Sequence, residues 1–297
     1  MTQRDAALAD VAGLHWADGQ AVLSGPLLAL ADRLDRRFVA MASRWQAAEL
    51  RFPAFLAAAE LERIDWFRSF PHLATFPACL DAEPANLERF AGGQPVSGDG
   101  RVQPSALAPI REVLTPAACY HLYAHHRGRR FDGPAHFTTS SVCFRRERHY
   151  LPLERQWSFT MREIVCMGTG AEARAFLDQA TATIDQLVSQ LGLPLRWEPA
   201  SDPFFQPSKN PRYLMQQVDP TKQELVFQGR LAIASANLHH DHFGRAFGIE
   251  RATGERAQPV HTACVAFGIE RWLAAFIHHF GPDAADWPQV DAVPTRR

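Results

Sequence analysis

Two β-rich segments joined by a polar loop constrain the fold of this chain more than any other part of its sequence. Residues 136–144 are rich in β-branched and aromatic side chains, and residues 157–166 alternate between apolar and polar side chains. A polar, charged loop at about 147–156 joins them, so the pair predicts an antiparallel hairpin. Further β-rich segments follow in the same half of the chain, at 225–227, 231–236 and 261–268. Because regular alternation of strands and helices is absent, the sequence predicts an α+β fold, with an antiparallel β-sheet flanked by helices.

Helical periodicity predicts the elements that flank this sheet. Apolar residues recur at helical spacing in five segments, 26–46, 55–68, 115–127, 171–191 and 269–280. The first segment is followed by a short alternating stretch, 49–52, that ends at Pro53. A long helix, a short strand and a proline therefore precede the hairpin.

The chain contains no internal repeat, and we expect a single domain over residues 1–297. Residues 80–104 combine acidic residues with several glycines and prolines, which predicts a loop, and we expect a mobile insertion around 80–112. We expect residues 288–297 to form a flexible C-terminal tail.

The charges of the chain are balanced, with 31 Lys and Arg against 32 Asp and Glu. Such a chain has no overall positive field that would attract nucleic acid, so substantial tRNA binding is not expected. No apolar run approaches the ~18 residues of a membrane span, and the polar residues 1–5 lack the apolar segment of a signal peptide. We therefore expect a cytoplasmic protein with no membrane partner.

The five cysteines are odd in number and widely spaced, which does not suit a disulfide framework. In a reducing compartment they are expected to be buried thiols or metal ligands. Their positions are Cys79, Cys119, Cys143, Cys166 and Cys264.

Several familiar signatures are absent, among them the phosphate loop G-x-x-x-x-G-K-[ST], the nucleophile elbow G-x-S-x-G, H-E-x-x-H and C-x-x-C. Residues 168–173 fit the looser dinucleotide-binding form G-x-G-x-x-G/A between a strand and a helix. The strand before such a site is buried on both faces and apolar throughout, whereas Ser158, Thr160 and Arg162 make one face of this strand polar. We interpret the segment as a tight turn into a helix, with a dinucleotide site as the alternative.

Two short motifs place an arginine directly after an expected strand. They are Phe144-Arg145-x-Glu147, with Phe159 in the returning strand of the hairpin, and Gly268-x-Glu270-Arg271, at a strand–helix junction. Taken alone, each arginine is typical of a surface ion pair. Taken together, two guanidinium groups at fixed positions can stabilise the charge that develops on a phosphate during adenylate formation.

This combination resembles the catalytic core of class II aminoacyl-tRNA synthetases. The hairpin motif is similar to motif 2 of that family, and the strand–helix motif is similar to motif 3. The helix, strand and Pro53 near the start resemble motif 1, which builds the dimer interface of the family. The resemblance therefore implies a homodimer that binds ATP.

The resemblance also implies a role for each ATP-site residue. Arg145 would hold the α-phosphate and the carboxylate of the amino acid, and Arg271 the γ-phosphate of a bent ATP. Glu147 would accept a hydrogen bond from the adenine amino group, Phe159 would stack on its ring, and Arg155 would cover the phosphates. The implied ATP site consists of Arg145, Glu147, Arg155, Gln156, Phe159, Ser235, Ala236, Asn237, Leu238 and Arg271. ATP would be used with Mg²⁺. The glutamate that binds Mg²⁺ in seryl enzymes corresponds to Ala232 here, so the Mg²⁺ ligands are not assigned.

A zinc site is implied by the resemblance and not by sequence spacing. Archaeal-type seryl-tRNA synthetases use a Cys-Glu-Cys zinc site, which corresponds here to Cys119, Glu163 and Cys264. Two thiolates and a carboxylate suit one Zn²⁺ per chain, and three protein ligands leave a position open for the amino group of the substrate. Glu163 and Arg145 would thus form the amino-acid site. Taken singly, each cysteine is more typical of a small buried hydrophobic residue.

Residues 26–282 resemble the amino acid:[carrier protein] ligases, which are small bacterial homologues of these enzymes. The resemblance is densest at 136–167 and 231–280. It implies ATP-dependent activation of a small amino acid, glycine or alanine, and transfer to the phosphopantetheine thiol of an acyl carrier protein. The first core helix is expected at residue 26, with no basic coiled coil before it, which disfavours tRNA as the acceptor. A seryl-type tRNA synthetase and a non-catalytic binding paralogue are the alternatives.

Histidines and arginines outside these motifs have two interpretations. His239, His240 and His242 lie close in sequence, and His121 and His125 share a helix face, but neither group has an evident third ligand. We interpret them as structural or loop histidines, with carrier or cofactor contacts as the alternative. Residues 125–130 form a local basic patch, which is either a solvated loop or a dock for an acidic carrier protein.

Overall fold

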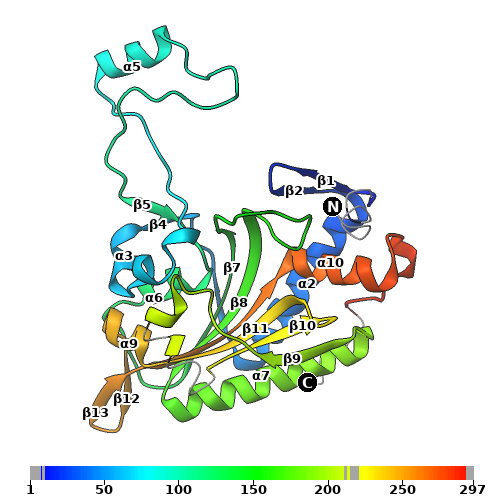
Figure 1. Ribbon diagram of the computed structural model, residues 1–297. Helices are drawn as coiled ribbons and strands as arrows, with labels where there is room; N and C mark the ends of the chain where they lie inside the picture. Colours follow the sequence, from blue (N-terminus) through cyan, green and yellow to red (C-terminus); the bar gives the residue numbers. More distant parts are fainter. Residues whose placement is uncertain (1–7, 9–10, 211–212, 215–220, 292–297) are drawn as a thin grey trace.

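The computed structural model describes Leu8 and residues 11–210, 213–214 and 221–291. At its centre is a sheet that has seven strands within these residues (Figure 1). In spatial order they are β3 (Ala48–Leu50), β7 (Ala135–Phe144), β8 (Ser158–Gly168), β14 (His261–Gly268), β11 (Leu231–His240), β10 (Lys222–Phe227) and β9 (Leu195–Pro199). β3 runs parallel to β7, and every other neighbouring pair is antiparallel. The predicted α+β fold is confirmed, as is the hairpin, which is β7–β8.

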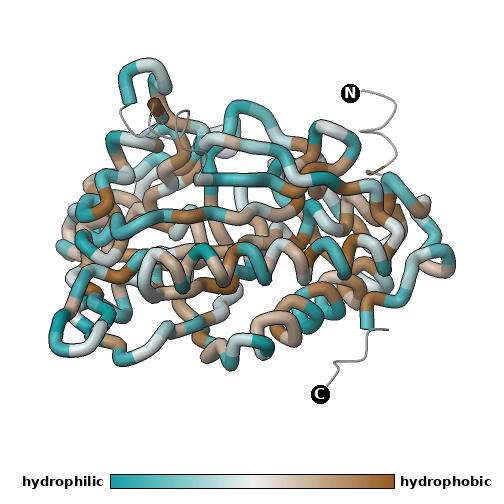
Figure 2. The backbone as a smooth tube through the Cα atoms, turned by 90° about the horizontal axis from the view of Figure 1, so that it is seen from below, coloured by the Kyte–Doolittle hydropathy of each residue, from teal (hydrophilic) through white to brown (hydrophobic). Residues whose placement is uncertain are grey.

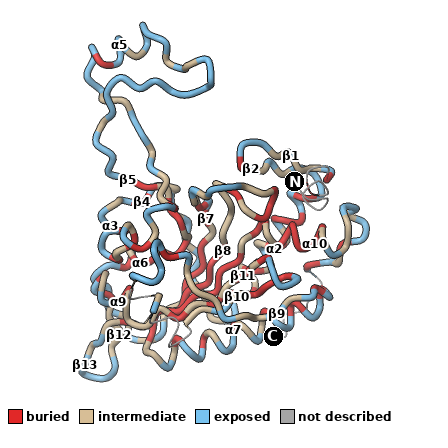
Figure 3. Tube along the Cα trace, in the orientation of Figure 1, coloured by how far each residue is buried: buried red, intermediate tan, exposed pale blue. Residues whose placement is uncertain are grey.

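Side chains of the central strands alternate between two faces, and each face has its own hydrophobic core. On β8, Ile164 and Cys166 belong to one core, whereas Val165 and Met167 belong to the other. Three long helices pack on the first face, namely α2 (Gly25–Ala42), α7 (Gly170–Leu191) and α10 (Ile269–Phe280). The second face receives short helices, α3 (Ala58–Arg63), α4 (Trp66–Ser69), α6 (Cys119–His125) and α9 (His242–Phe247). Figure 3 shows how burial concentrates in these central strands.

The turn at residues 168–173 is a helix start, as the sequence predicted. The Thr169 hydroxyl accepts from the Glu172 N–H, and the Glu172 carboxylate accepts in return from the Thr169 N–H, 2.7 Å away. This reciprocal capping box begins α7. The helix ends at Gly192, whose φ of 69° is a conformation that glycine adopts without strain. In Figure 2, hydrophobic and hydrophilic residues are interspersed along the helices on this side of the sheet.

The single helix predicted over 55–68 is wrong. Its first residues form a strand, β4 (Phe55–Ala57), which pairs with β5 (Glu112–Leu114). The rest is divided into α3 and α4, because Asp65 between them has a φ of 59° and cannot continue a right-handed helix. Similarly, the helix predicted over 115–127 begins only at Cys119.

The segment predicted as a loop at 80–104 contains a helix, α5 (Pro84–Gly92), so that prediction is wrong in part. Pro84 lies in the first turn, and the Glu83 carboxylate accepts from the Asn86 N–H at 3.0 Å. The buried amide of Asn86 donates to the carbonyls of Asp81 and Ala106, which ties the two ends of the segment together. In Figure 1 the segment extends away from the rest of the molecule.

The remaining elements lie around this framework. They are the hairpin β1 (Leu14–Ala17) and β2 (Gln20–Leu23), which was not predicted, the small sheet of β6 (Arg130–Phe131), β12 (Glu250–Thr253) and β13 (Arg256–Pro259), and the 3₁₀ turns η1 (Ser43–Trp45), η2 (Pro71–Leu73), η3 (Pro207–Lys209) and η4 (Ala284–Asp286). Of the predicted C-terminal tail, Val290 is buried in the first core, so residues 288–291 do not form a free tail. Residues 292–297 and the polar start at 1–5 lie outside the described residues. No described helix combines the length and the hydrophobicity needed to cross a bilayer.

Candidate active site

Two cavities share part of their lining on the second face of the central sheet. The larger has a volume of about 460 Å³ and the smaller of about 120 Å³. Five residues line both: Arg145, Met161, Lys222, Ser235 and Ala266. A ligand can therefore extend from one cavity into the other past two basic side chains.

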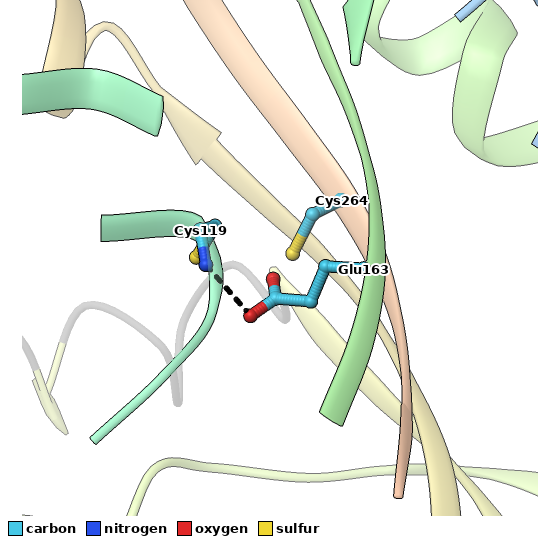
Figure 4. A group of neighbouring side chains, drawn as sticks. All are labelled: Cys119, Glu163 and Cys264. Carbon is cyan, nitrogen blue, oxygen red and sulfur yellow. Dashed lines mark hydrogen bonds between the residues drawn. The ribbon is translucent and has the colours of Figure 1, made fainter. Parts of the chain in front are cut away.

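Two thiols and a carboxylate converge in the wall of the larger cavity (Figure 4). Ligand atoms of Cys119, Glu163 and Cys264 all lie within 4.8 Å of one another, and all three residues are buried. Strand alternation on β8 and β14 turns Glu163 and Cys264 toward the same face, and the start of α6 brings Cys119 opposite them. The Cys119 N–H donates to Glu163 Oε1 at 3.0 Å, which fixes the carboxylate.

The chemistry of this cluster fits a zinc ion. Two thiols and a carboxylate are typical zinc ligands, and three protein ligands are characteristic of zinc sites that keep a position open for a substrate. Without a cation, the neighbouring Cys264 thiol, burial and the Glu163 carboxylate raise the pKa of the Cys119 thiol. A divalent cation would compensate the buried negative charge that this arrangement otherwise disfavours. Among the residues that the structure describes, no other cluster of three or more His, Cys, Asp or Glu side chains has this spacing.

The smaller cavity contains Arg271, the first basic residue of α10. Its Nε donates to the backbone carbonyl of Glu154 and its Nη1 to that of Ala232, each at 2.9 Å. Neighbouring Glu270 is buried, and its carboxylate accepts from the Thr160 N–H at 2.9 Å. Burial raises the pKa of Glu270 to about 7. The guanidinium of Arg271 is thus held in place by two backbone carbonyls of other elements.

Residues of the hairpin also line the smaller cavity. Arg145 follows the end of β7, its Nε donates to the Pro116 carbonyl at 3.0 Å, and its guanidinium lies 5.1 Å from the centre of the Phe159 ring. The Arg155 guanidinium pairs with the Glu147 carboxylate at 2.5 Å. All four of these hairpin side chains line the smaller cavity, as does buried Gln156.

The segment 235–238, predicted as part of the ATP site, is divided by the structure. Ser235 lines both cavities, whereas Asn237 and Leu238 line only the larger one, on the side of the thiols. Ala236 lines neither cavity, and its side chain belongs to the core on the other face of the sheet. Ser235 is therefore the residue of this segment that the structure brings together with Arg271.

Other charged residues that line these cavities were given no role from the sequence, among them Glu154, Lys222 and Glu270. Glu154, in the β7–β8 loop, is buried between the Arg230 guanidinium, at 2.6 and 2.8 Å, and His278 Nε2, at 2.8 Å. Burial alone would raise the pKa of Glu154, but hydrogen bonds from His278 and Arg230 lower it to about 2. Sequence alone gives no signal for this contact.

Lys222 and Glu270 are two more charged residues of the cavity walls. The Lys222 ammonium lies 3.0 Å from carboxylate oxygens of both Asp202 and Glu224, and although burial lowers its pKa, these two neighbours raise it overall. Lys222 therefore remains charged where the two cavities meet. Glu270 precedes Arg271 within the strand–helix motif, so that motif was a signal for its location.

The histidines and the basic patch supply none of the three potential ligands of the thiol cluster, although His239 contacts the Cys264 sulfur. Among the described residues, no histidine belongs to a group of three potential metal ligands. Burial lowers the pKa of His121, and burial with nearby positive charge lowers that of His126, in each case to about 4, so both are neutral near pH 7. Within the basic patch, Arg127 pairs with Glu60, and Arg129 contacts the His126 ring.

The fold is that of known class II synthetases. The family model of the tRNA synthetase class II core domain (G, H, P, S and T) matches residues 107–280, more than half of the chain. The crystal structure of M. kandleri SerRS in complex with A. aeolicus tRNASec superposes with a TM-score of 0.79 at 18% identity. That alignment covers 97% of this chain but 59% of the synthetase.

Curated relatives define the family more narrowly. Amino acid--[acyl-carrier-protein] ligases 1 and 2 of Bradyrhizobium diazoefficiens are 36% and 37% identical, over 80% of this chain and 73% and 72% of their own lengths. A type-2 serine--tRNA ligase of Methanococcus maripaludis is 28% identical over 60% of this chain, and only 37% of that enzyme is covered. The chain accordingly belongs to the amino acid--[acyl-carrier-protein] ligases, a family built on the class II tRNA synthetase core.

Proposed function

We propose that this protein activates a small amino acid with ATP and transfers it to the phosphopantetheine thiol of an acyl carrier protein. One observation supports the proposal above all others. A cavity with a Cys-Glu-Cys cluster opens, past Arg145 and Lys222, into a second cavity that contains Arg271. An aminoacyl adenylate, with its amino acid at one end and its nucleotide at the other, suits two joined cavities of this kind.

The first step is proposed to join the two substrates at this junction. A carboxylate oxygen of the amino acid attacks the α-phosphorus of ATP, the bond from that phosphorus to the pyrophosphate oxygen breaks, and pyrophosphate leaves. Negative charge grows on the phosphate oxygens during this displacement. Arg145 lies where the cavities meet and Arg271 lies in the smaller one, so their guanidinium groups are placed to stabilise that charge.

The amino-acid end of the substrate belongs in the larger cavity. Cys119, Glu163 and Cys264 would hold Zn²⁺, which when bound supplies an electrophilic position for the amino group of the substrate. A cavity of about 460 Å³ is far larger than glycine or alanine needs. We propose that the remaining space receives the thiol arm of the carrier protein.

The second step needs little beyond positioning. The sulfur of the carrier thiol attacks the carbonyl carbon of the adenylate, a thioester forms, and the C–O bond to the phosphate breaks with release of AMP. The proton of the thiol passes to solvent. A thiol attacking a mixed anhydride is chemically facile when the reactants are held together, so no nucleophilic side chain of the enzyme is required.

Two assays test the two steps separately. Amino-acid-dependent exchange of pyrophosphate into ATP, measured for a panel of amino acids with zinc-replete protein, is expected with glycine or alanine. Absence of exchange with every amino acid refutes adenylation. A transfer assay then compares carrier protein with and without its phosphopantetheine, alongside tRNA. Labelling only of the phosphopantetheinylated carrier is expected, whereas labelling of tRNA favours a seryl-type synthetase instead.

A further inference from the structure

A polar row on strand β11 leads from the junction of the two cavities to the thiol cluster. It begins at Ser235, which lines both cavities, and continues to Asn237 and His239, which line the larger one. The Asn237 side-chain amide donates to Ser235 Oγ at 3.0 Å and to Cys264 Sγ at 3.4 Å. The two hydrogens of one amide group therefore satisfy one hydroxyl and one thiol.

Strand register places Asn237 beside the sulfur. Asn237 on β11 is directly opposite Cys264 on the neighbouring strand β14. Side chains of such a cross-strand pair lie on the same face of the sheet and contact each other. The contact between the amide and the thiol is therefore fixed by backbone pairing and not by a flexible loop.

A β-bulge brings a second polar side chain to the same sulfur. The pairing of β11 with β14 shifts between Leu238 and His240, so His239 has no partner in the register. Bulges often redirect a side chain next to a functional site. Here His239 Nε2 lies 3.8 Å from Cys264 Sγ, and its Nδ1 lies 3.1 Å from the buried hydroxyl of Thr262. The Thr262 contact orients the imidazole ring toward the sulfur.

We infer that Asn237 is a positioning residue for the metal site, whose amide N–H group holds the Cys264 thiolate in place for the ion, with His239 in a supporting role. This inference rests on the zinc site of the proposed function. Donors to a ligating sulfur orient it and draw electron density from it, and loss of such a partner typically weakens metal binding about 10- to 100-fold. This role of Asn237 differs from the role in ATP binding that the family resemblance implies for it.

Zinc affinity of the purified full-length protein provides the test. Native protein, Asn237→Ala and Asn237→Leu are titrated with zinc in competition with a chromophoric chelator, and Ser235→Ala, two residues away on the same strand face, is the matched control. We expect zinc to bind Asn237→Leu about 10- to 100-fold more weakly than native protein. Ser235→Ala should bind zinc within about 3-fold of native protein, because the contact of Asn237 with the sulfur remains. If Asn237→Leu does not fold, Asn237→Ala gives the same comparison.

Cobalt substitution adds a readout that general destabilisation does not produce. A hydrogen bond to the sulfur makes charge transfer from thiolate to Co²⁺ more costly, so its removal should shift the charge-transfer band of the Asn237 variants to longer wavelength. Native zinc affinity, an unchanged cobalt spectrum and a raised KM for ATP in both variants would overturn the inference and restore the nucleotide role. Zinc binding by native protein without any pyrophosphate exchange refutes the proposed ligase activity but leaves this comparison valid. Native protein that binds no zinc refutes the inference and the zinc site on which it rests, while the exchange assay still decides the ligase activity.

Discussion

Arg271 Nε donates to the backbone carbonyl of Glu154 at 2.9 Å, although the two residues lie 117 positions apart in the chain. The carbonyl belongs to the loop of the β7–β8 hairpin, and the arginine belongs to helix α10. The Glu154 carboxylate is in turn held by Arg230 and His278. The orientation of the guanidinium in the smaller cavity therefore depends on how the buried Glu154 carboxylate is held behind the loop.

Replacing Glu154 with glutamine should loosen this loop and destabilise the protein. The folded-state pKa of Glu154 is about 2 against an ordinary value of 4.5, so above about pH 4.5 its ionised form stabilises the fold. A difference of about 2.5 units corresponds to about 3 kcal/mol at pH 7, and this stabilisation disappears as the pH falls from 4.5 toward 2. Urea unfolding of native protein and Glu154→Gln at pH 7, 5 and 3 should show the stability difference shrinking at the lowest pH.

Glu198→Gln is the control for that experiment, because its partner Arg196 is largely exposed and surface pairs contribute about 0–1 kcal/mol. A difference between native protein and Glu154→Gln that stays constant from pH 7 to pH 3 would contradict the assigned role. In exchange assays at pH 7, Glu154→Gln should raise KM for ATP more than KM for the amino acid, since Arg271 lies in the smaller cavity.

Arg271→Ala should reduce kcat/KM for ATP in pyrophosphate exchange about 100- to 1000-fold, the usual loss when one preorganised donor to a developing charge is removed. Arg271→Lys should recover little of it. A lysine has a single ammonium group, which cannot donate to the Glu154 and Ala232 carbonyls and also present a planar fork to a phosphate. Circular dichroism of both variants controls for folding. Activity of Arg271→Ala within 3-fold of native protein would exclude a role for this arginine in activation.

The zinc content of the protein should depend on Cys119, Glu163 and Cys264. It should not depend on the other buried cysteines, Cys143 and Cys166. We expect about one zinc per native chain by elemental analysis, and loss of most of it in Cys119→Ala and Cys264→Ala, because the cluster supplies three ligands. Cys143→Ala, which removes an equally buried thiol on β7, is the matched control and should retain the metal. Equal zinc in Cys119→Ala and Cys143→Ala would argue against this cluster as the site.

Local sequence patterns predicted the fold well where the secondary structure of a segment follows from its own residues. Alternation between 157 and 166 predicted β8, and the same alternation explains why Glu163 and Val165 lie on one face while Ile164 lies on the other. Applied to 235–238, it would also have separated Ser235 and Asn237 from Ala236. The helix α5 was missed because the glycines and prolines around it indicate a loop. The Glu83 carboxylate that caps its start is only three residues from its partner, so this signal was present in the local sequence.

Long-range contacts could not be predicted from such patterns. The thiol cluster joins residues 44 and 101 positions apart, and only the family resemblance related them before the structure was known. The pairs of Glu154 with Arg230 and of Lys222 with Asp202 leave no periodic signal, because each depends on how two loops or strand ends meet. The bulge at His239 is similarly invisible, since it is defined by the register of β11 against β14.

An ion cluster around the buried Arg162, on the opposite face of the sheet, offers a final prediction about stability. Arg162 on β8 is almost fully buried, and its guanidinium donates to both carboxylate oxygens of Asp35 on α2, at 2.8 and 2.7 Å, and to Glu49 on β3 at 2.8 Å. It thereby ties the first helix and the edge strand to the hairpin. Asp35→Ala leaves the buried charge with one partner, so it should lower the free energy of unfolding by about 1.5–3 kcal/mol, the usual worth of hydrogen bonds to charged groups.

The loss of stability caused by Asp35→Ala should nearly vanish in a variant that lacks Arg162. Arg162→Met removes the buried charge, and both carboxylates can then turn to solvent, because Asp35 and Glu49 are 31% and 50% exposed. Adding Asp35→Ala to Arg162→Met should therefore cost less than about 0.5 kcal/mol. Urea unfolding of the two single variants and the double variant completes the cycle. Additive losses would mean that Asp35 stabilises helix α2 independently of Arg162, and the proposed tie between helix and hairpin would have to be abandoned.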